Sequence, residues 1–162
     1  MQASERVLAF DFGASSGRAM LAWLEDGGLK LEEVHRFSNE PVMAAGRLYW
    51  DVLRLFHELK KGICKAQAAG GFSALAIDTW GVDFGLLDRH GRLLQNPVHY
   101  RDLRTEGVPE KVFRTVSKEE IYSRTGIQYM RFNTIYQLAA LKAEEPELLG
   151  QADGLLLIPD LF

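Results

Sequence analysis

The chain has 162 residues, 47% hydrophobic and 25% charged, with a formal net charge of −3. These values predict a soluble globular protein with one good hydrophobic core. No apolar run is long enough to cross a bilayer, and no basic stripe indicates a nucleic-acid partner. The N-terminal segment lacks the layout of a secretory signal peptide, so we expect a cytoplasmic protein. Cys64, the single cysteine, lies in a helical pattern, and we expect it to be buried.

Three antiparallel strands are predicted at the start of the chain. Val7–Phe12 is apolar without strict alternation, which predicts a strand buried on both faces. Arg18–Glu25 is the second predicted strand, Asp26–Gly28 is a tight turn, and Leu29–Phe37 is the third strand. Leu48–Trp50 follows a polar loop and is predicted as a short edge strand.

A helix is then predicted over Val52–Ala69, with Asp51 as its N-cap and a stop at Gly70-Gly71. Its expected apolar stripe contains Leu53, Phe56, Lys60 and Ile63, widened by Leu55 and Leu59. Ala74–Ile77 is predicted as a short buried strand that ends at Asp78.

The second half of the chain is mostly helical in prediction. Asp83–Leu87 is expected to be a strand, and Ser117–Glu120 fits a capping box before a short helix. Thr134–Gln137 fits a second capping box, before a helix that runs to about Glu145. Gly154–Ile158 is a final strand, with a further helix beginning at Pro159.

This order of elements predicts an α/β fold with a mixed sheet, in which three antiparallel strands come first and helices pack on the sheet. By analogy of order, it is the ribonuclease-H-like half of the actin/hexokinase architecture.

The turn between the first two strands, Asp11-Phe12-Gly13-Ala14-Ser15-Ser16-Gly17-Arg18, carries the first candidate site. Small residues allow several backbone N–H groups to approach a phosphate, and a carboxylate at the strand end suits Mg²⁺. Together they suggest a phosphotransferase. The alternative is an ordinary turn, because Gly, Ser and Asp are common turn formers. The chain has neither a P-loop nor a G-x-G-x-x-G fingerprint.

The second candidate is Asp78-Thr79-Trp80-Gly81-Val82-Asp83-Phe84. Asp78 and Asp11 both end strands, and would open into one crevice if those strands are neighbours. Trp80 suits a sugar ring, Gly81 exposes backbone, and Asp83 can accept hydrogen bonds from a polyol. The alternative makes Trp80 a core aromatic and Gly81 a bulge.

Two further segments have structural alternatives. Arg101 or Arg104 is expected to pair with Asp102 in an ion pair or with a carboxylate across a cleft. Asn133 or Thr134 is expected to cap the helix that follows.

These motifs, with Tyr100-Arg101-Asp102 and Ser123-Arg124-Thr125-Gly126-Ile127-Gln128 after them, come in the order found in a known family. The chain resembles the FGGY family of carbohydrate kinases, in particular the branch that phosphorylates L-rhamnulose. The resemblance implies transfer of the γ-phosphoryl group of ATP to the 1-hydroxyl of L-rhamnulose or a related ketose. It also implies Mg²⁺ and a two-domain enzyme.

The resemblance also implies roles for individual residues. The phosphate-binding residues would be Ala14, Ser15, Ser16, Gly17 and Arg18, with Asp11 as the magnesium-associated carboxylate. The sugar contacts would be Gly81 and Trp80, with Asp83 on the same segment and Phe132 as an aromatic contact.

Family members are much longer than this chain, and their catalytic base lies beyond the matching part. The resemblance therefore assigns no catalytic residue here. It implies that residues 1–162 form an N-terminal domain without its C-terminal, ATPase-like half, inactive alone. Alternatives are a kinase of the xylulose or fuculose type, a non-catalytic sugar- or nucleotide-binding module, and an actin-like assembly domain.

Overall fold

The computed structural model describes residues 5–162, which divide into two compact units. The first contains the chain up to Glu40, Asp51–Gly81 and Ile158–Phe162. The second contains Pro41–Trp50 and Val82–Leu157.

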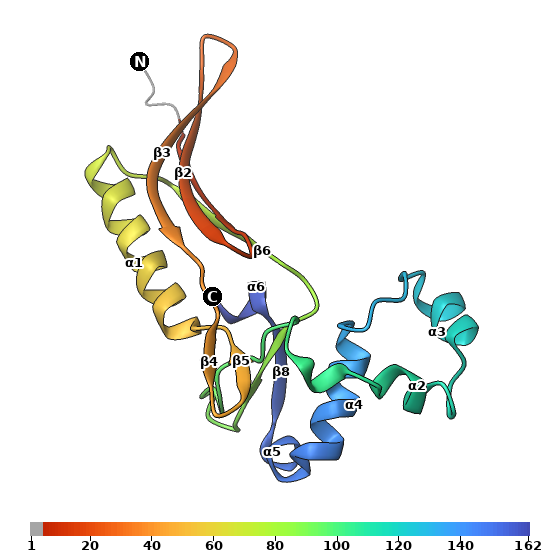
Figure 1. Cartoon of the computed structure of the whole chain (residues 1–162). Coiled ribbons are helices and arrows are strands. Elements are labelled where there is room, and N and C mark those ends of the chain that lie inside the picture. The colour runs from red at the N-terminus through yellow and green to blue at the C-terminus, as the bar shows by residue number, and fades with distance from the viewer. Residues whose placement is uncertain (1–4) are drawn as a thin grey trace. The chain divides into compact units, whose positions relative to one another are not determined.

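A four-stranded sheet forms the centre of the first unit (Figure 1). Its strands are β1 (Val7–Phe12), β2 (Ser16–Glu25), β3 (Gly28–Ser38) and β6 (Ala74–Thr79). The order is β3-β2-β1-β6; β1 and β6 are parallel and the other pairs are antiparallel. The predicted mixed sheet with three antiparallel strands first is confirmed.

The turn between β2 and β3 is the two-residue type expected of a tight hairpin. Asp26 and Gly27 both have positive φ, at 52° and 75°, which matches the twist of the flanking strands.

Helix α1 (Val52–Ala68) lies against this sheet. The Asp51 carboxylate accepts a hydrogen bond from the Arg54 N–H at 3.0 Å, so the predicted N-cap is confirmed. The predicted apolar stripe is confirmed in part: Leu55 and Leu59 are buried and Ile63 packs on the core, whereas Leu53 and Phe56 are 73% and 43% exposed. The buried side of α1 consists of Val52, Leu55, Glu58, Leu59, Gly62 and Ala66. Choosing between overlapping apolar residues required knowing which face meets the sheet.

Helix α1 approaches the sheet closely at Gly62. A Cβ atom there would lie 2.6 Å from the ring of Phe10. Phe10 and Phe12 are each 1% exposed and belong to the same core, with their rings edge to face.

Strand β1 is buried on one face only, so the prediction of burial on both faces is wrong. Leu8, Phe10 and Phe12 are buried, whereas Val7 and Asp11 are exposed. Strand β6 is also largely exposed rather than buried. Helix α1 covers one face of the sheet, and the buried side chains of β1 lie on that face only.

The second unit contains two small sheets and several short helices. Its strands are β4 (Val42–Ala44), β5 (Arg47–Tyr49), β7 (Phe84–Leu87) and β8 (Gly154–Leu157). Its helices are η1 (Leu103–Thr105), α2 (Val108–Val112), α3 (Lys118–Thr125), α4 (Thr134–Glu144) and α5 (Pro146–Gln151). A last short helix, α6 (Ile158–Leu161), belongs to the first unit.

Of the two predicted capping boxes, the one at Ser117–Glu120 has the expected N-cap hydrogen bond. The Ser117 hydroxyl accepts a hydrogen bond from the Glu120 N–H at 3.1 Å at the start of α3. At the start of α4 the prediction is wrong, because the N-cap residue, Asn133, makes no capping side-chain bond. The Thr134 and Gln137 side chains instead bind the segment at Val82 and Asp83.

Cys64 is exposed on α1, so the prediction of a buried cysteine is wrong. Among residues 5–162, no helix has the length and apolar character needed to span a bilayer.

Candidate functional site

The turn between β1 and β2 is held from one side by Asn39, which is 3% exposed. Its side-chain amide donates to the Gly13 carbonyl at 2.8 Å, and its backbone N–H donates to the Ser15 carbonyl at 2.9 Å. The Gly13 N–H closes the turn on the Ser16 carbonyl at 2.9 Å. Several polar groups of the turn are therefore engaged within the protein.

The N–H groups of Ala14 and Ser15 have no acceptor within the described part of the chain. Ser15 is exposed and Ala14 half-buried, so these donors lie near the surface. Unpaired backbone donors in a turn of small residues fit the oxygens of a phosphate group.

Gly17 is needed for packing, not only for an open turn. It lies within β2, and a Cβ atom there would be 2.1 Å from Cζ of Phe37. Phe37 is 7% exposed and its ring packs edge to face on Phe12. A glycine is therefore required where the Phe37 ring crosses β2.

Asp11 and Asp78 hold paired positions on the parallel strands β1 and β6. Paired positions in register project side chains to the same face, and both carboxylates are exposed. The expected condition, that the strands ending in Asp11 and Asp78 are neighbours, is confirmed. The Asp11 carboxylate also accepts from the Arg18 guanidinium at 2.8 Å.

This arrangement fits Mg²⁺, which proteins hold through one or two carboxylates together with water and substrate phosphates. No group of three or more His, Cys, Asp or Glu side chains suited to a metal occurs among residues 5–162. An ion held here would therefore rely on few protein ligands.

The predicted sugar segment is divided between the two units. Trp80 is half-buried and packs against the core of the first unit, which agrees with its interpretation as a core aromatic. Gly81 is exposed, and a Cβ atom added to it would meet no other atom within 4 Å. Val82, where the chain enters the second unit again, has a φ of 70°, which is an outlier for a β-branched residue.

Asp83 has a different environment from the one expected for a sugar ligand. It is fully buried. Its carboxylate accepts from Trp50 Nε1 at 2.6 Å, from Gln137 Nε2 at 2.8 Å and from the Tyr100 N–H at 3.2 Å. Because the carboxylate is fully buried and already accepts these bonds, Asp83 is better suited to fixing the segment than to touching the sugar.

Phe132 is the end of a row of aromatic rings in the second unit. The ring centroids are 3.9 Å apart between Trp50 and His99, 4.5 Å between His99 and Tyr100, and 5.4 Å between Tyr100 and Phe132. Tyr100 and Phe132 are half-buried, whereas Trp50 and His99 are buried. The half-buried end of this row suits the apolar face of a sugar.

His99 is kept neutral by its surroundings. Burial lowers the pKa of its imidazole to about 4, and the charge of Arg101 adds to the effect. Its Nδ1 accepts a hydrogen bond from the Arg101 N–H at 2.9 Å. A neutral ring stacked between two aromatic rings is consistent with a structural role.

The expected partners of Asp102 are wrong. Its side chain pairs with Arg47 at 3.5 Å, and neither Arg101 nor Arg104 forms that ion pair through its side chain. The Arg104 guanidinium donates instead to Gln137 at 2.7 Å. Residues 47 and 102 are far apart in sequence, so spacing could not reveal this pair.

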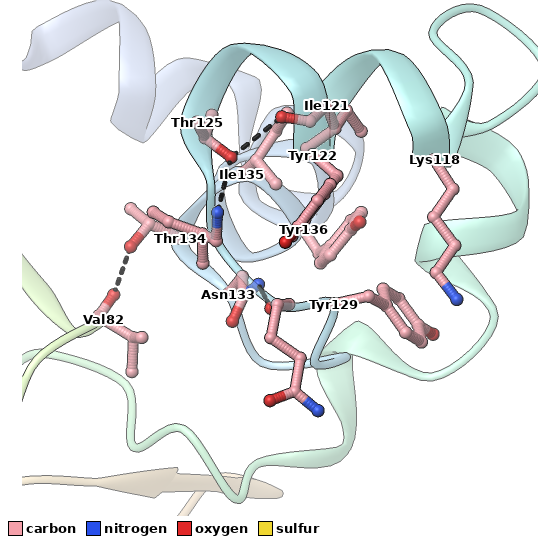
Figure 2. A pocket seen from close by; sticks show the side chains of 12 residues that line it. Val82, Lys118, Ile121, Tyr122, Thr125, Tyr129, Asn133, Thr134, Ile135 and Tyr136 are labelled. Carbon is pink, nitrogen blue, oxygen red and sulfur yellow. Dashed lines mark hydrogen bonds between the residues drawn. The ribbon is translucent and has the colours of Figure 1, made fainter.

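A pocket of about 560 Å³ lies between α3, α4 and the segment that joins them (Figure 2). Apolar and aromatic side chains dominate its lining, among them Ile121, Tyr122 and Tyr136. Val82 and Thr134 are also lining residues, joined by a hydrogen bond of 2.8 Å. None of Trp80, Gly81, Asp83 and Phe132 lines it, so it is not the predicted sugar site.

The sequence as a whole matches a known protein family. Residues 6–162 match the family described as "FGGY family of carbohydrate kinases, N-terminal domain". The chain belongs to the FGGY family of carbohydrate kinases.

Curated relatives within this family include rhamnulokinases. The chain is 48% identical to a rhamnulokinase of Oceanobacillus iheyensis over 94% of its length, and 41% identical to one of Bacteroides thetaiotaomicron over 96%. It covers 33% and 32% of those proteins. The chain thus spans about a third of the length of the curated relatives it matches.

Solved structures of FGGY kinases share the fold. A gluconate kinase from Lactobacillus acidophilus superposes with a TM-score of 0.81 at 17% identity, covering 95% of this chain and 31% of that one. A xylulose kinase from the same organism gives 0.80 at 18% identity, covering 93% and 31%. These likenesses confirm the actin/hexokinase-type fold.

Sequence reasoning missed two residues of this FGGY domain that organise the candidate site. Asn39 holds the turn between β1 and β2, and Gln137 binds both the Val82–Asp83 segment and the Phe132 carbonyl. Asn39 follows the third predicted strand without any local pattern. Gln137 does belong to a recognisable sequence pattern, Thr134–Gln137, but that pattern predicts a capping box and not a contact with Asp83.

Proposed function

We propose that this chain is the sugar- and phosphate-binding N-terminal part of an ATP-dependent kinase that phosphorylates L-rhamnulose at its 1-hydroxyl. The identity of 41–48% to rhamnulokinases over nearly the whole chain carries this proposal. The unpaired N–H groups of the turn at Ala14 and Ser15 support its phosphate-binding part.

The phosphate end of the substrate pair is assigned to the turn between β1 and β2. The N–H groups of Ala14 and Ser15 bind phosphate oxygens, with Ser16 and Gly17 completing the turn. Arg18 neutralises phosphate charge, for which its guanidinium must turn away from Asp11. Asp11 holds Mg²⁺, which supplies charge neutralisation on the ATP phosphates when bound.

The sugar end is assigned to Trp80, Gly81 and Phe132. Gly81 presents open backbone for a hydroxyl, and the rings of Phe132 and Trp80 suit the carbon face of a ketose. Asp83 fixes the sugar-binding segment from behind. These residues bind and orient the acceptor, and no residue of this chain is assigned the role of general base.

The remaining two thirds of a full-length enzyme, judged by the relatives' lengths, would supply that base and the adenosine contacts. Phosphoryl transfer depends on positioning and on charge stabilisation, so both parts are needed for turnover. We propose a cytoplasmic enzyme of sugar catabolism.

The experiment is a coupled assay of the full-length polypeptide that carries this sequence, with Mg-ATP and L-rhamnulose, L-xylulose, D-xylulose, L-fuculose or glycerol. We expect the highest kcat/KM for L-rhamnulose. A clear preference for another ketose would move the assignment to another FGGY branch, and sugar binding without turnover would favour a non-catalytic module.

A further inference from the structure

Val82 adopts a backbone conformation that its own side chain disfavours. Its φ of 70° lies in the left-handed region, which β-branched residues rarely enter. Such a conformation persists only where the surrounding structure holds it, and it often marks a functional segment. Val82 is bonded to Gly81 and Asp83, which flank it in the proposed sugar-binding segment.

Two side chains from the first turn of α4 hold the Val82 carbonyl. Thr134 Oγ1 donates to it at 2.8 Å (Figure 2), and Gln137 Nε2 lies 3.3 Å from it. These groups fix the peptide plane that follows Val82.

Gln137 joins this carbonyl to the rest of the candidate site. It is 1% exposed, and its Nε2 also donates to Asp83 Oδ1 at 2.8 Å and to the Phe132 carbonyl at 2.9 Å. Its Oε1 accepts from the Arg104 guanidinium at 2.7 Å. Two amide protons thus serve three acceptors, and Arg104 fixes the direction in which the amide points.

The polar side chains at the N-terminus of α4 bind groups outside the helix. Asn133 is the N-cap residue but makes no capping bond, and its side-chain amide donates to the Gln128 carbonyl at 3.0 Å. Thr134 and Gln137 have the sequence spacing of a capping box but lie within the helix, where they bind Val82 and Asp83.

We propose that Thr134 and Gln137 are positioning residues for the sugar. They hold Val82 in the left-handed conformation and so fix Val82 and Asp83 relative to Phe132, within the second unit. The proposal rests on the proposed function, because it assigns these segments to the sugar site. It predicts that loss of either contact weakens sugar use more than ATP use.

The test is steady-state kinetics of the full-length enzyme with L-rhamnulose and ATP. Thr134→Val removes the donor while keeping the shape, and we expect the KM for L-rhamnulose to rise about fivefold, the equivalent of one hydrogen bond. Thr134→Ser should restore the parental KM. Gln137→Glu replaces a donor with an acceptor beside Asp83, and should raise the sugar KM roughly tenfold or more. The KM for ATP should stay within about twofold of the parental value in every variant.

Thr125→Val is the matched control, because Thr125 also lines the pocket of Figure 2 but donates within α3, to the Ile121 carbonyl at 2.8 Å. It should leave both KM values unchanged. A Thr134→Val enzyme with a lower Tm and a parental sugar KM would overturn the proposal, as would equal rises in both KM values.

Hydrogen exchange separates this inference from the proposed function. In Gln137→Glu, the backbone N–H groups of residues 81–84 should exchange faster than in the parent, whether or not the parent phosphorylates L-rhamnulose. Unchanged exchange there overturns the positioning role. An inactive parent overturns the proposed function alone.

Discussion

The ring of Phe37 crosses β2 directly over Gly17, so closely that a Cβ atom on residue 17 would lie 2.1 Å from Cζ of Phe37. The contact joins the proposed phosphate turn to the core of the sheet, because Phe37 packs in turn on Phe12. The turn geometry therefore depends on a contact within the core.

Gly17→Ala should lower the free energy of unfolding by about 1–3 kcal/mol, because the added methyl group overpacks this contact. Urea denaturation measures the change. Gly28→Ala is the matched control, since a Cβ atom there would meet only the Glu25 carbonyl at 3.6 Å. Phe37→Leu should recover part of the loss in the double variant; full loss in that variant would contradict overpacking as the cause.

Asp11→Ala in the full-length enzyme should lower kcat at least ~100-fold, because the carboxylate is proposed to hold Mg²⁺. Binding of L-rhamnulose, measured by calorimetry, should be retained, because the carboxylate is not proposed to contact the sugar. Stability should change by less than about 1 kcal/mol, since the Asp11–Arg18 pair is half exposed. Glu33→Gln is the control, because Glu33 also pairs with an arginine, Arg36, on the exposed part of the sheet. An unchanged kcat in Asp11→Ala would refute the metal role.

Asp83→Ala should destabilise the protein by about 3 kcal/mol or more, because it leaves buried donors of Trp50, Tyr100 and Gln137 without their acceptor. Chemical denaturation followed by tryptophan fluorescence measures this loss. The exposed Asp153 provides the comparison, and Asp153→Ala should change stability by less than ~0.5 kcal/mol. A stable Asp83→Ala protein that had lost only sugar binding would return Asp83 to the role of direct ligand.

Stability should also fall in mild acid because of His99. Its pKa in the folded protein is about 4, below the ordinary value of 6.5, so between these values the unfolded chain binds more protons than the folded one. The contribution of His99 is therefore complete above about pH 6.5 and is lost progressively as the pH falls to about 4. Denaturation across this range measures the slope, which should be smaller in His99→Phe.

Identical slopes in the parent and in His99→Phe would show that His99 does not stay neutral in the folded state.

Local signals in the sequence predicted the elements of this fold well. The apolar run at Val7–Phe12, the Asp51 cap and the Asp26-Gly27 turn each act through neighbours in sequence, and each is found in the structure. The sequence brings Asp11 and Asp78 together only on the condition that their strands are neighbours, and the structure meets this condition, because β1 and β6 are paired.

The failures share one physical cause, which is contact between residues distant in sequence. The face of α1 that is buried depends on Phe10 and its neighbours in the sheet, and the partner of Asp102 is Arg47. At Thr134 and Gln137, the pattern of a local cap was present, but the side chains bind acceptors more than 50 residues away. Local patterns identify donors and acceptors but not which distant groups compete for them.

The two units interrupt one another along the chain, at positions 40/41, 50/51, 81/82 and 157/158. No single cut releases either unit whole, so domain dissection by simple truncation would remove part of both. At the C-terminal end, Phe162 belongs to the first unit, where its ring packs edge to face on Phe12 with centroids 5.1 Å apart. Deleting the last five residues would expose part of the β1 core, and expression trials should keep them.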